Sequence, residues 1–144
     1  MSNGGFLISQ VKQLSDRIFE KILKEKGVNE FNGAQGRILY ILWNNNNISI
    51  KKISIFTKLA KTTLTTMLER MENQGLIKRI DGVKDKRETL IALTDKAKLL
   101  QNDYYDVTNR MEKIFYRNFN ESEIKNFENI LKKIIENLEV KNAR

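Results

Sequence analysis

The apolar spacing of this chain is mostly helical with one break, after Gly75, and that break limits the possible folds more than any other feature. Before Gly75, apolar residues recur every three or four positions, which is the spacing of one helix face. After it come two short β-rich runs, LIKRI at 76–80 and TLIAL at 89–93. A charged segment around an Asp-Gly turn separates them. The pattern predicts a β-hairpin with a long charged tip within a mostly helical chain.

Two short helical segments come directly before the hairpin. Ser49 is expected to cap the first, whose predicted buried face is Ile53, Phe56 and Leu59. The second covers residues 61–75, KTTLTTMLERMENQG, and closes at Gly75. Its apolar stripe follows helical spacing and consists of Leu64, Met67, Leu68 and Met71. A helix-turn-helix followed by a two-stranded wing is a winged helix, which we predict over residues 33–93.

The segments outside residues 33–93 are predicted to be helical. A first helix is expected to end near Gly27, and a second to run from a cap at Asn32 to the asparagines at 44–47. After the hairpin, Thr94 is expected to cap a long helix, and Asn120 with Glu123 to begin the last one. The apolar stripes are Leu7, Val11, Leu14, Ile18 and Ile22; Ala97, Leu100, Tyr104, Val107, Met111 and Ile114; and Ile124, Phe127, Leu131, Ile134 and Leu138.

These outer stripes are too large for the small middle region to cover, so a partner is expected. A two-fold dimer is the commonest oligomer. The predicted fold class is therefore mainly α with a small β-hairpin wing. Its organisation is an N-terminal dimerisation helix in residues 1–32, a winged helix-turn-helix in 33–93 and C-terminal dimerisation helices in 94–144.

The charge of the chain is concentrated in the predicted winged helix. The 144 residues carry a net charge of +8. Residues 33–93 hold 11 basic and 5 acidic side chains, a net of +6, and the rest hold 15 and 13, a net of +2. This asymmetry is typical of a protein that binds nucleic-acid phosphates through its middle. A protein bound to a ribosome or membrane surface could also show it.

Missing residue types argue against several functions. With no Cys and no His, the chain lacks thiolate chemistry, the commonest general base and the commonest metal ligand. No other spacing suggests catalysis, so we expect no enzyme activity, no cofactor and no metal. The longest apolar run, Ile38 to Trp43, is too short to span a bilayer, and the N-terminus does not look like a signal peptide. These features predict a cytoplasmic protein with no membrane partner.

Four threonines near the start of the 61–75 helix are unusual, because β-branching lowers helix propensity. Their methyl groups can contact thymine in a major groove, and their hydroxyls can donate or accept hydrogen bonds. The polar face they share also carries basic residues. It consists of Lys61, Thr62, Thr65, Thr66, Glu69, Arg70 and Asn73. The competing interpretation is a solvated face without a partner.

The stretch from Ile48 to Lys98 resembles the multiple-antibiotic-resistance regulator (MarR) family of bacterial transcription factors. DKRETLIALTDKA, residues 85–97, is similar to the family's Asp-x-Arg wing, following strand and Leu-Thr before a long helix. KTTLTTMLERMENQGLI, residues 61–77, is similar to the family's recognition helix, and Gln35 falls where the family often has Gln. Ala60 departs from the usual Ser or Asp cap, Lys58 from a frequent Gly or Asn, and Ala97 from a common Gly.

This resemblance implies a homodimeric regulator, more often a repressor than an activator, bound to a pseudo-palindromic site on double-stranded DNA. It implies that Arg87 enters the minor groove, that Asp85 holds Arg87 through a charge-assisted bond, and that Lys84 and Lys86 lie over phosphates. The residues expected to face DNA from the recognition helix are Lys61, Thr62, Thr63, Thr65, Thr66 and Arg70, with local packing as an alternative for Thr63. An ordinary solvated tip is the alternative for the wing.

The resemblance also implies control by a small aromatic or phenolic effector bound between the dimer helices and the winged helix. Phe19, Tyr40, Trp43 and Tyr104 are candidates for lining that site, although core packing is the preferred interpretation for each. The alternative function is a winged-helix module that contacts proteins, or nucleic acid without operator specificity.

Overall fold

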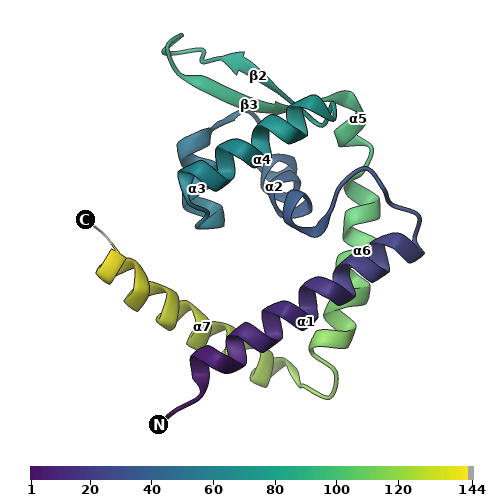
Figure 1. The fold of residues 1–144 in the computed structure, drawn as a ribbon, viewed down its shortest axis with the longest axis vertical. Coiled ribbons are helices and arrows are strands. Elements are labelled where there is room, and N and C mark those ends of the chain that lie inside the picture. The colour runs from purple at the N-terminus through teal and green to yellow at the C-terminus, as the bar shows by residue number, and fades with distance from the viewer. Residues whose placement is uncertain (143–144) are drawn as a thin grey trace. The chain divides into compact units, whose positions relative to one another are not determined.

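The computed structural model describes residues 1–142, which belong to two compact units. The first covers Met1–Met111 and the second begins at Glu112. The first unit carries the helix-turn-helix and the sheet, and Figure 1 shows the course of the chain through them. The elements are α1 (Gly4–Glu25), α2 (Gly33–Asn44), β1 (Ile48–Ser49), α3 (Ile50–Thr57), α4 (Lys61–Asn73), β2 (Ile77–Asp81), β3 (Thr89–Leu93), α5 (Asp95–Lys98), α6 (Gln101–Phe115) and α7 (Glu121–Asn142).

The helices begin at the predicted capping residues. Asn32 and Gln35 form a reciprocal capping box at the start of α2, and the side chains of Ser49 and Thr94 accept hydrogen bonds at the starts of α3 and α5. These interactions satisfy N–H groups that have no partner within the helix.

Two helices end at the predicted glycines. Gly27 after α1 and Gly75 after α4 both have positive φ, which glycine adopts at little cost. After α4, the N–H of Gly75 bonds the carbonyl of Glu72 and that of Leu76 bonds the carbonyl of Met71. This is the Schellman arrangement, and it places Leu76 and Met71 together in the core.

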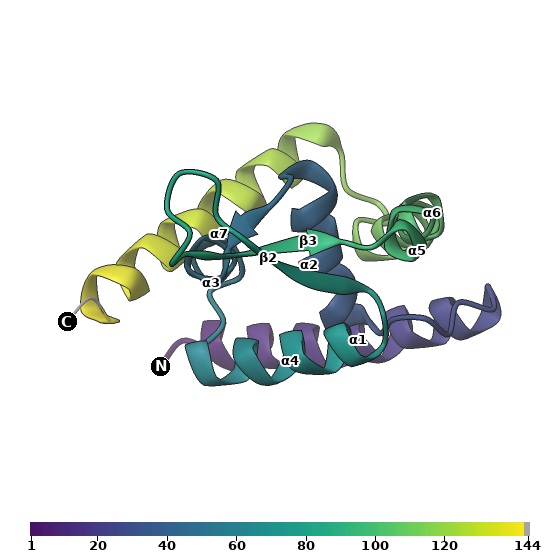
Figure 2. The same ribbon diagram turned by 90° about the horizontal axis from the view of Figure 1, so that it is seen from above.

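The wing is a β-hairpin, as predicted, but the sheet has a third strand. Its order is β1-β3-β2, with both pairs antiparallel. Ile77 pairs with Leu93 and Asp81 with Thr89, and the loop joining β2 and β3 extends past the strand ends (Figure 2). The edge strand β1 was not predicted, because two residues are too few to show an alternating pattern.

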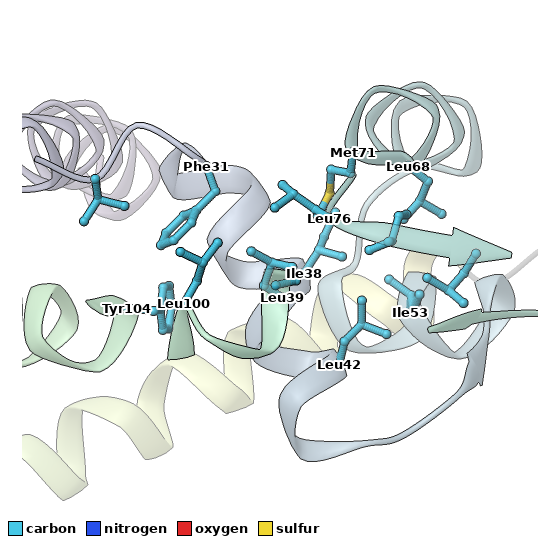
Figure 3. Close-up of a cluster of buried hydrophobic side chains, with 14 of the residues drawn as sticks. Phe31, Ile38, Leu39, Leu42, Ile53, Leu68, Met71, Leu76, Leu100 and Tyr104 are labelled. Carbon is cyan, nitrogen blue, oxygen red and sulfur yellow. The ribbon is translucent and has the colours of Figure 1, made fainter. Parts of the chain in front are cut away.

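The core of the first unit is built around α2, the central helix of the winged helix. Ile38, Leu39 and Leu42 are buried and meet side chains from α3, α4, the hairpin and α6 (Figure 3). The predicted stripe of the 61–75 helix is confirmed, since Leu64, Leu68 and Met71 are buried and Met67 is half-buried against them. This packing fixes which side of α4 faces outward.

Two expectations about burial and helix length were wrong. Phe56 is 55% exposed, whereas Thr57 beside it is half-buried and donates from Oγ1 to the carbonyl of Ile53. The long helix expected after Thr94 is divided into α5 and α6. At the division, Leu100 N–H bonds Ala97 three residues back rather than four, which is a tighter turn than an α-helix makes.

The second unit contains α7, which begins with the predicted capping box between Asn120 and Glu123. The ring of Tyr116 packs against Phe127, and its hydroxyl donates to Glu128 Oε2 at 2.7 Å. No residue of α7 is buried, contrary to the predicted stripe. Ile124, Phe127 and Leu131 are half-buried, and Ile134 and Leu138 are exposed.

The overall class is as predicted: a mainly helical protein with a small antiparallel wing sheet. None of the helices in residues 1–142 is both long enough and apolar enough to cross a membrane.

Candidate DNA-binding surface

The start of α4 is held by backbone geometry rather than by a cap. Lys58 ends α3 in the left-handed conformation, with φ of 61°, and Ala60 occupies the N-cap of α4 without a side-chain hydrogen bond. The first N–H groups of α4 therefore lack the partner that a Ser or Asp cap would supply. A helix N-terminus in this state favours an anion such as a phosphate.

The threonines of α4 lie on its outward side. Thr62, Thr63 and Thr66 are exposed and Thr65 is half-buried, so the packing alternative for Thr63 gains no support. Thr65 Oγ1 donates to the carbonyl of Lys61 at 2.8 Å, and Thr66 Oγ1 donates to that of Thr62 at 3.1 Å. Because these hydroxyl protons are already used, the two side chains offer a methyl group and acceptor lone pairs to a partner.

Arg70 is exposed near the other end of α4, away from the threonines. It lines a cleft of about 550 Å³ together with residues of α1, α2 and the loop between them. Arg70 and Lys24 bring positive charge to the cleft and Glu20 brings negative charge. The predicted recognition residues thus form one cluster at the start of α4, with Arg70 separate from it.

The wing tip holds Arg87 through a two-pronged contact with Asp85. Arg87 Nε donates to Asp85 Oδ1 at 3.1 Å and Nη2 donates to Oδ2 at 3.2 Å, while the Arg87 backbone N–H donates to Oδ1 at 3.0 Å. The predicted charge-assisted bond between these two residues is confirmed. The Arg87 side chain remains 91% exposed, and Lys84 and Lys86 beside it are exposed as well.

The hydrogen bonds from Arg87 hold the pKa of the Asp85 carboxyl below its ordinary value. Asp85 is therefore ionised at neutral pH, and the contact with Arg87 is present there. An ion pair this exposed contributes little to folding. Its effect is to limit the rotamers of Arg87, so that the guanidinium is held over the loop.

Gly82 makes the tight turn of the wing loop possible. Its N–H donates to the carbonyl of Glu88 at 2.8 Å, and Glu88 N–H returns to the carbonyl of Asp85 at 3.1 Å. A Cβ at position 82 would collide with that same Asp85 carbonyl oxygen. The backbone that carries Asp85 and Arg87 can therefore close only over a glycine.

The wing and α4 are linked by more than the chain between them. Arg79 Nε in β2 donates to Glu72 Oε1 in α4 at 3.3 Å. Thr94, at the end of the wing, donates from Oγ1 to the carbonyl of Gly75 at 2.6 Å. The two elements predicted to meet DNA are thus joined through both strands of the hairpin.

The four aromatic residues proposed for an effector site do come together. The ring centroids of Phe19, Tyr40 and Trp43 lie 6.1, 6.0 and 5.5 Å from that of Tyr104. Tyr104 is buried, which raises the pKa of its hydroxyl, and its ring lies so close to Gly36 that a Cβ there would collide with it. Trp43 Nε1 donates to the Ala97 carbonyl at 3.1 Å. The core interpretation therefore holds for Tyr104, with Phe19 and Trp43 half-buried against it, and is wrong for Tyr40, which is 47% exposed.

Two residues that shape this surface were not identified as functional from the sequence. Gly82 was noticed for its turn but not for the close approach it allows. Gln74 forms a bond with Gln35, which is 39 positions earlier, and no local pattern reveals such a pair. Gln35 itself was found by resemblance, although an Asn followed three residues later by Gln is a recognisable capping signal.

Comparisons with known proteins agree with this geometry. Residues 31–89 match the model of the MarR family. Over 69 residues the chain is 41% identical to an organic hydroperoxide resistance transcriptional regulator of Bacillus subtilis, covering 48% of this chain and 47% of that protein. Over 98 residues it is 30% identical to the HTH-type transcriptional regulator MgrA of Staphylococcus aureus, covering 68% and 65%. The matches therefore span about half to two thirds of these relatives.

Solved structures show the same fold over most of the chain. A crystal structure of a mutant MarR from E. coli, complexed with operator DNA, has a TM-score of 0.80 at 24% identity, covering 90% of this chain and 91% of that one. A structure of reduced AbfR bound to DNA has a TM-score of 0.71 at 28% identity, covering 92% and 88%.

Proposed function

We propose that this chain, which belongs to the MarR family of winged helix-turn-helix regulators, is a homodimeric DNA-binding transcriptional regulator. The proposal includes repression from a pseudo-palindromic operator. The observation that carries it is the clamp of Asp85 on Arg87 at the tip of the wing. A contact this exposed contributes little to folding, yet it restricts a guanidinium whose side chain is 91% exposed.

The wing is suited to a minor groove. A narrow, A·T-rich groove has an enhanced negative potential, which favours an inserted arginine. The clamp already restricts Arg87 to few rotamers, so less side-chain entropy is lost when Arg87 binds. Lys84 and Lys86 flank it in exposed positions from which an ammonium can reach phosphates.

The start of α4 is suited to a major groove. Its uncapped N–H groups favour a phosphate, and the exposed threonines can meet base edges and thymine methyl groups. Two such helices in a two-fold dimer would meet successive major grooves about 34 Å apart. The proposed binding site is therefore an inverted repeat.

The dimer is proposed from exposed apolar side chains in each unit. In α1 these include Leu7, Val11 and Leu14, and in α7 they include Ile134 and Leu138. Stripes of this size on a lone chain favour self-association.

We also propose, by analogy with the family, that a small aromatic or phenolic effector controls DNA binding. The B. subtilis relative is named for organic hydroperoxide resistance. A cysteine-based peroxide response is outside what this chain can do, because it has no Cys.

The test is selection from a pool of random DNA duplexes followed by sequencing of the bound fraction. We expect enrichment of an inverted repeat with half-sites about one helical turn apart. Arg87→Ala should then weaken specific binding by about 1–3 kcal/mol. Arg110→Ala is the matched control, because it also removes one positive charge and one exposed ion pair, that with Glu25 at 2.9 Å.

The results separate the alternatives. Salt-sensitive binding without an enriched sequence would replace the regulator with a non-specific nucleic-acid module. Equal loss of affinity in Arg87→Ala and Arg110→Ala would mean that Arg87 contributes to binding only through its charge.

A further inference from the structure

Gln35 is the one buried polar residue in the described part of the chain, and both ends of its amide are used. Its side chain is part of the capping box of α2, where Oε1 accepts from the backbone N–H of Asn32 at 3.1 Å. Its Nε2 donates to Gln74 Oε1 at 2.9 Å. Gln74 is the C-cap of α4, so a buried amide of α2 is tied directly to the end of the proposed recognition helix.

The end of α4 is restrained at two further points. Lys96 Nζ donates to the carbonyl of Gln74 at 3.2 Å, and Thr94 Oγ1 donates to that of Gly75 at 2.6 Å. The start of α4 has no side-chain cap. Side-chain hydrogen bonds therefore restrain the C-terminal end of the helix, while its threonine end is held by the burial of Leu64.

The apolar contacts of α4 set which side of the helix is buried, but they restrain its exact rotation and axial position less sharply than a directional bond does. Leu64, Leu68 and Met71 hold the helix against the core, but hydrophobic attraction is non-directional. Such contacts tolerate small rotations about the helix axis. A hydrogen bond weakens steeply when its angle or distance changes, so the bond between Gln35 and Gln74 limits the rotation and axial shift of α4.

We propose that Gln35 and Gln74 are positioning residues for sequence-specific DNA recognition, through an amide bridge from the buried Gln35 to the exposed Gln74 that sets the rotation and axial position of α4. This inference rests on the proposed function. The bridge acts through the helix, since Gln35 is buried and lies on another element. Its loss removes the partner of Gln35 Nε2 at the edge of the cleft that both glutamines line, which favours displacement of the helix end until a new partner is found.

The experiment changes Gln74, because Gln35 also completes the capping box of α2 and its loss would mix two effects. Gln74→Ala removes the acceptor from an exposed position, so the variant is expected to fold. Gln74→Glu is the rescue, because a carboxylate of the same length can accept from Gln35 Nε2. Gln101→Ala is the matched control, since it removes another glutamine bond, that to Tyr105 at 2.9 Å, from outside α4.

Each variant is measured at one salt concentration on the selected operator and on an unrelated duplex, with folding checked by circular dichroism. We expect Gln74→Ala to lower the ratio of specific to non-specific affinity about tenfold. Gln74→Glu should keep the ratio, although its added charge weakens binding to both duplexes. Gln101→Ala should change neither affinity.

The outcomes distinguish the two proposals. If the wild-type chain enriches no sequence, the proposed function is overturned and this inference with it. If the wild-type chain binds specifically and Gln74→Ala keeps the wild-type ratio, the positioning role is overturned while the regulator stands. A ratio that falls in Gln74→Glu as much as in Gln74→Ala would also overturn it, because the bond would then be irrelevant.

Discussion

At the scale of single residues, the wing tip shows how a local pair can orient a side chain without stabilising the fold. Asp85 and Arg87 are two positions apart, so their contact needs no tertiary packing, and the family resemblance of the wing was enough to predict it. The bond between Gln35 and Gln74 was not, because it depends on how α2 and α4 pack. Phe56 was misplaced for a related reason: spacing alone did not show that Phe56 would be more exposed than Thr57 beside it.

The clamp predicts a measurable titration. Arg87 lowers the pKa of the Asp85 carboxyl below its ordinary value of 3.8. The carboxylate form is the one that binds Arg87, so the clamp is complete above pH 3.8 and is lost as the pH falls through the lowered pKa. A side-chain NMR titration should therefore show Asp85 ionising below its ordinary pKa, and Arg87→Ala should raise that pKa.

Arg79→Ala is the control for this titration, because Arg79 bonds Glu72 rather than Asp85. An Asp85 pKa that is equally low in Arg87→Ala would mean that another group causes the shift.

The threonines predict a contrast between two substitutions of Thr66. Its hydroxyl proton is held by the Thr62 carbonyl, so the methyl group is the part offered to a thymine. Thr66→Ser removes that methyl and should weaken operator binding about fourfold, the value of roughly 0.8 kcal/mol for one buried carbon. Thr66→Val keeps a methyl and should bind close to wild type. Fluorescence anisotropy on the selected operator measures both, and the reverse order would assign the contact to the hydroxyl.

At the scale of elements, the sequence predicted the ends of the helices well and the pairing of the β-strands less well. Asn32, Ser49, Thr94, Gly27 and Gly75 act locally, through side-chain acceptors or left-handed backbone, and each ends or begins a helix as expected. The two-residue strand β1 is held by β3, far along the chain, with Ile48 opposite Ile91. β1 is extended only because it pairs with β3, so no local sequence pattern predicts it.

The uncapped α4 predicts a stabilising substitution. Ala60→Ser places an acceptor at the N-cap and should raise the free energy of unfolding by about 1 kcal/mol. Ser49→Ala, which removes the bond to the Lys52 N–H in α3, should lower it by a similar amount. Urea unfolding followed by circular dichroism measures both. A destabilised Ala60→Ser would show that the backbone before α4 cannot place a cap.

The wing loop predicts that geometry can be separated from charge. Gly82→Ala keeps every charge but forces the Asp85 carbonyl to move. We expect specific binding to fall toward that of Arg87→Ala, with the helical circular dichroism unchanged. Gly5→Ala is the control, since a Cβ there has no neighbour within 4 Å. Wild-type binding by Gly82→Ala would show that the loop conformation does not matter for recognition.

At the scale of the whole molecule, the exposed stripes of α1 and α7 predict a dimer. Light scattering at micromolar concentration should give twice the chain mass of 16.9 kDa. Leu14→Glu puts a charge on an exposed apolar position of α1 and should shift the mass toward one chain without unfolding it. Ser9→Glu, on the opposite face of the helix, should leave the dimer intact. A wild-type monomer would contradict the two-fold arrangement.

The link between α4 and the wing has a consequence for how binding sites can vary. Glu72 and Arg79 join the helix to β2, and a single residue, Leu76, lies between the glycine that ends the helix turn and the first residue of the strand. We therefore expect helix and wing to move as one rigid unit that contacts DNA at two points a constant distance apart. A base pair inserted between the positions that α4 and the wing are proposed to contact should therefore abolish specific binding to that half-site. The spacing between the two half-sites depends instead on the dimer. Genomic sites should therefore keep the spacing within each half-site constant and vary, if at all, in the spacing between half-sites.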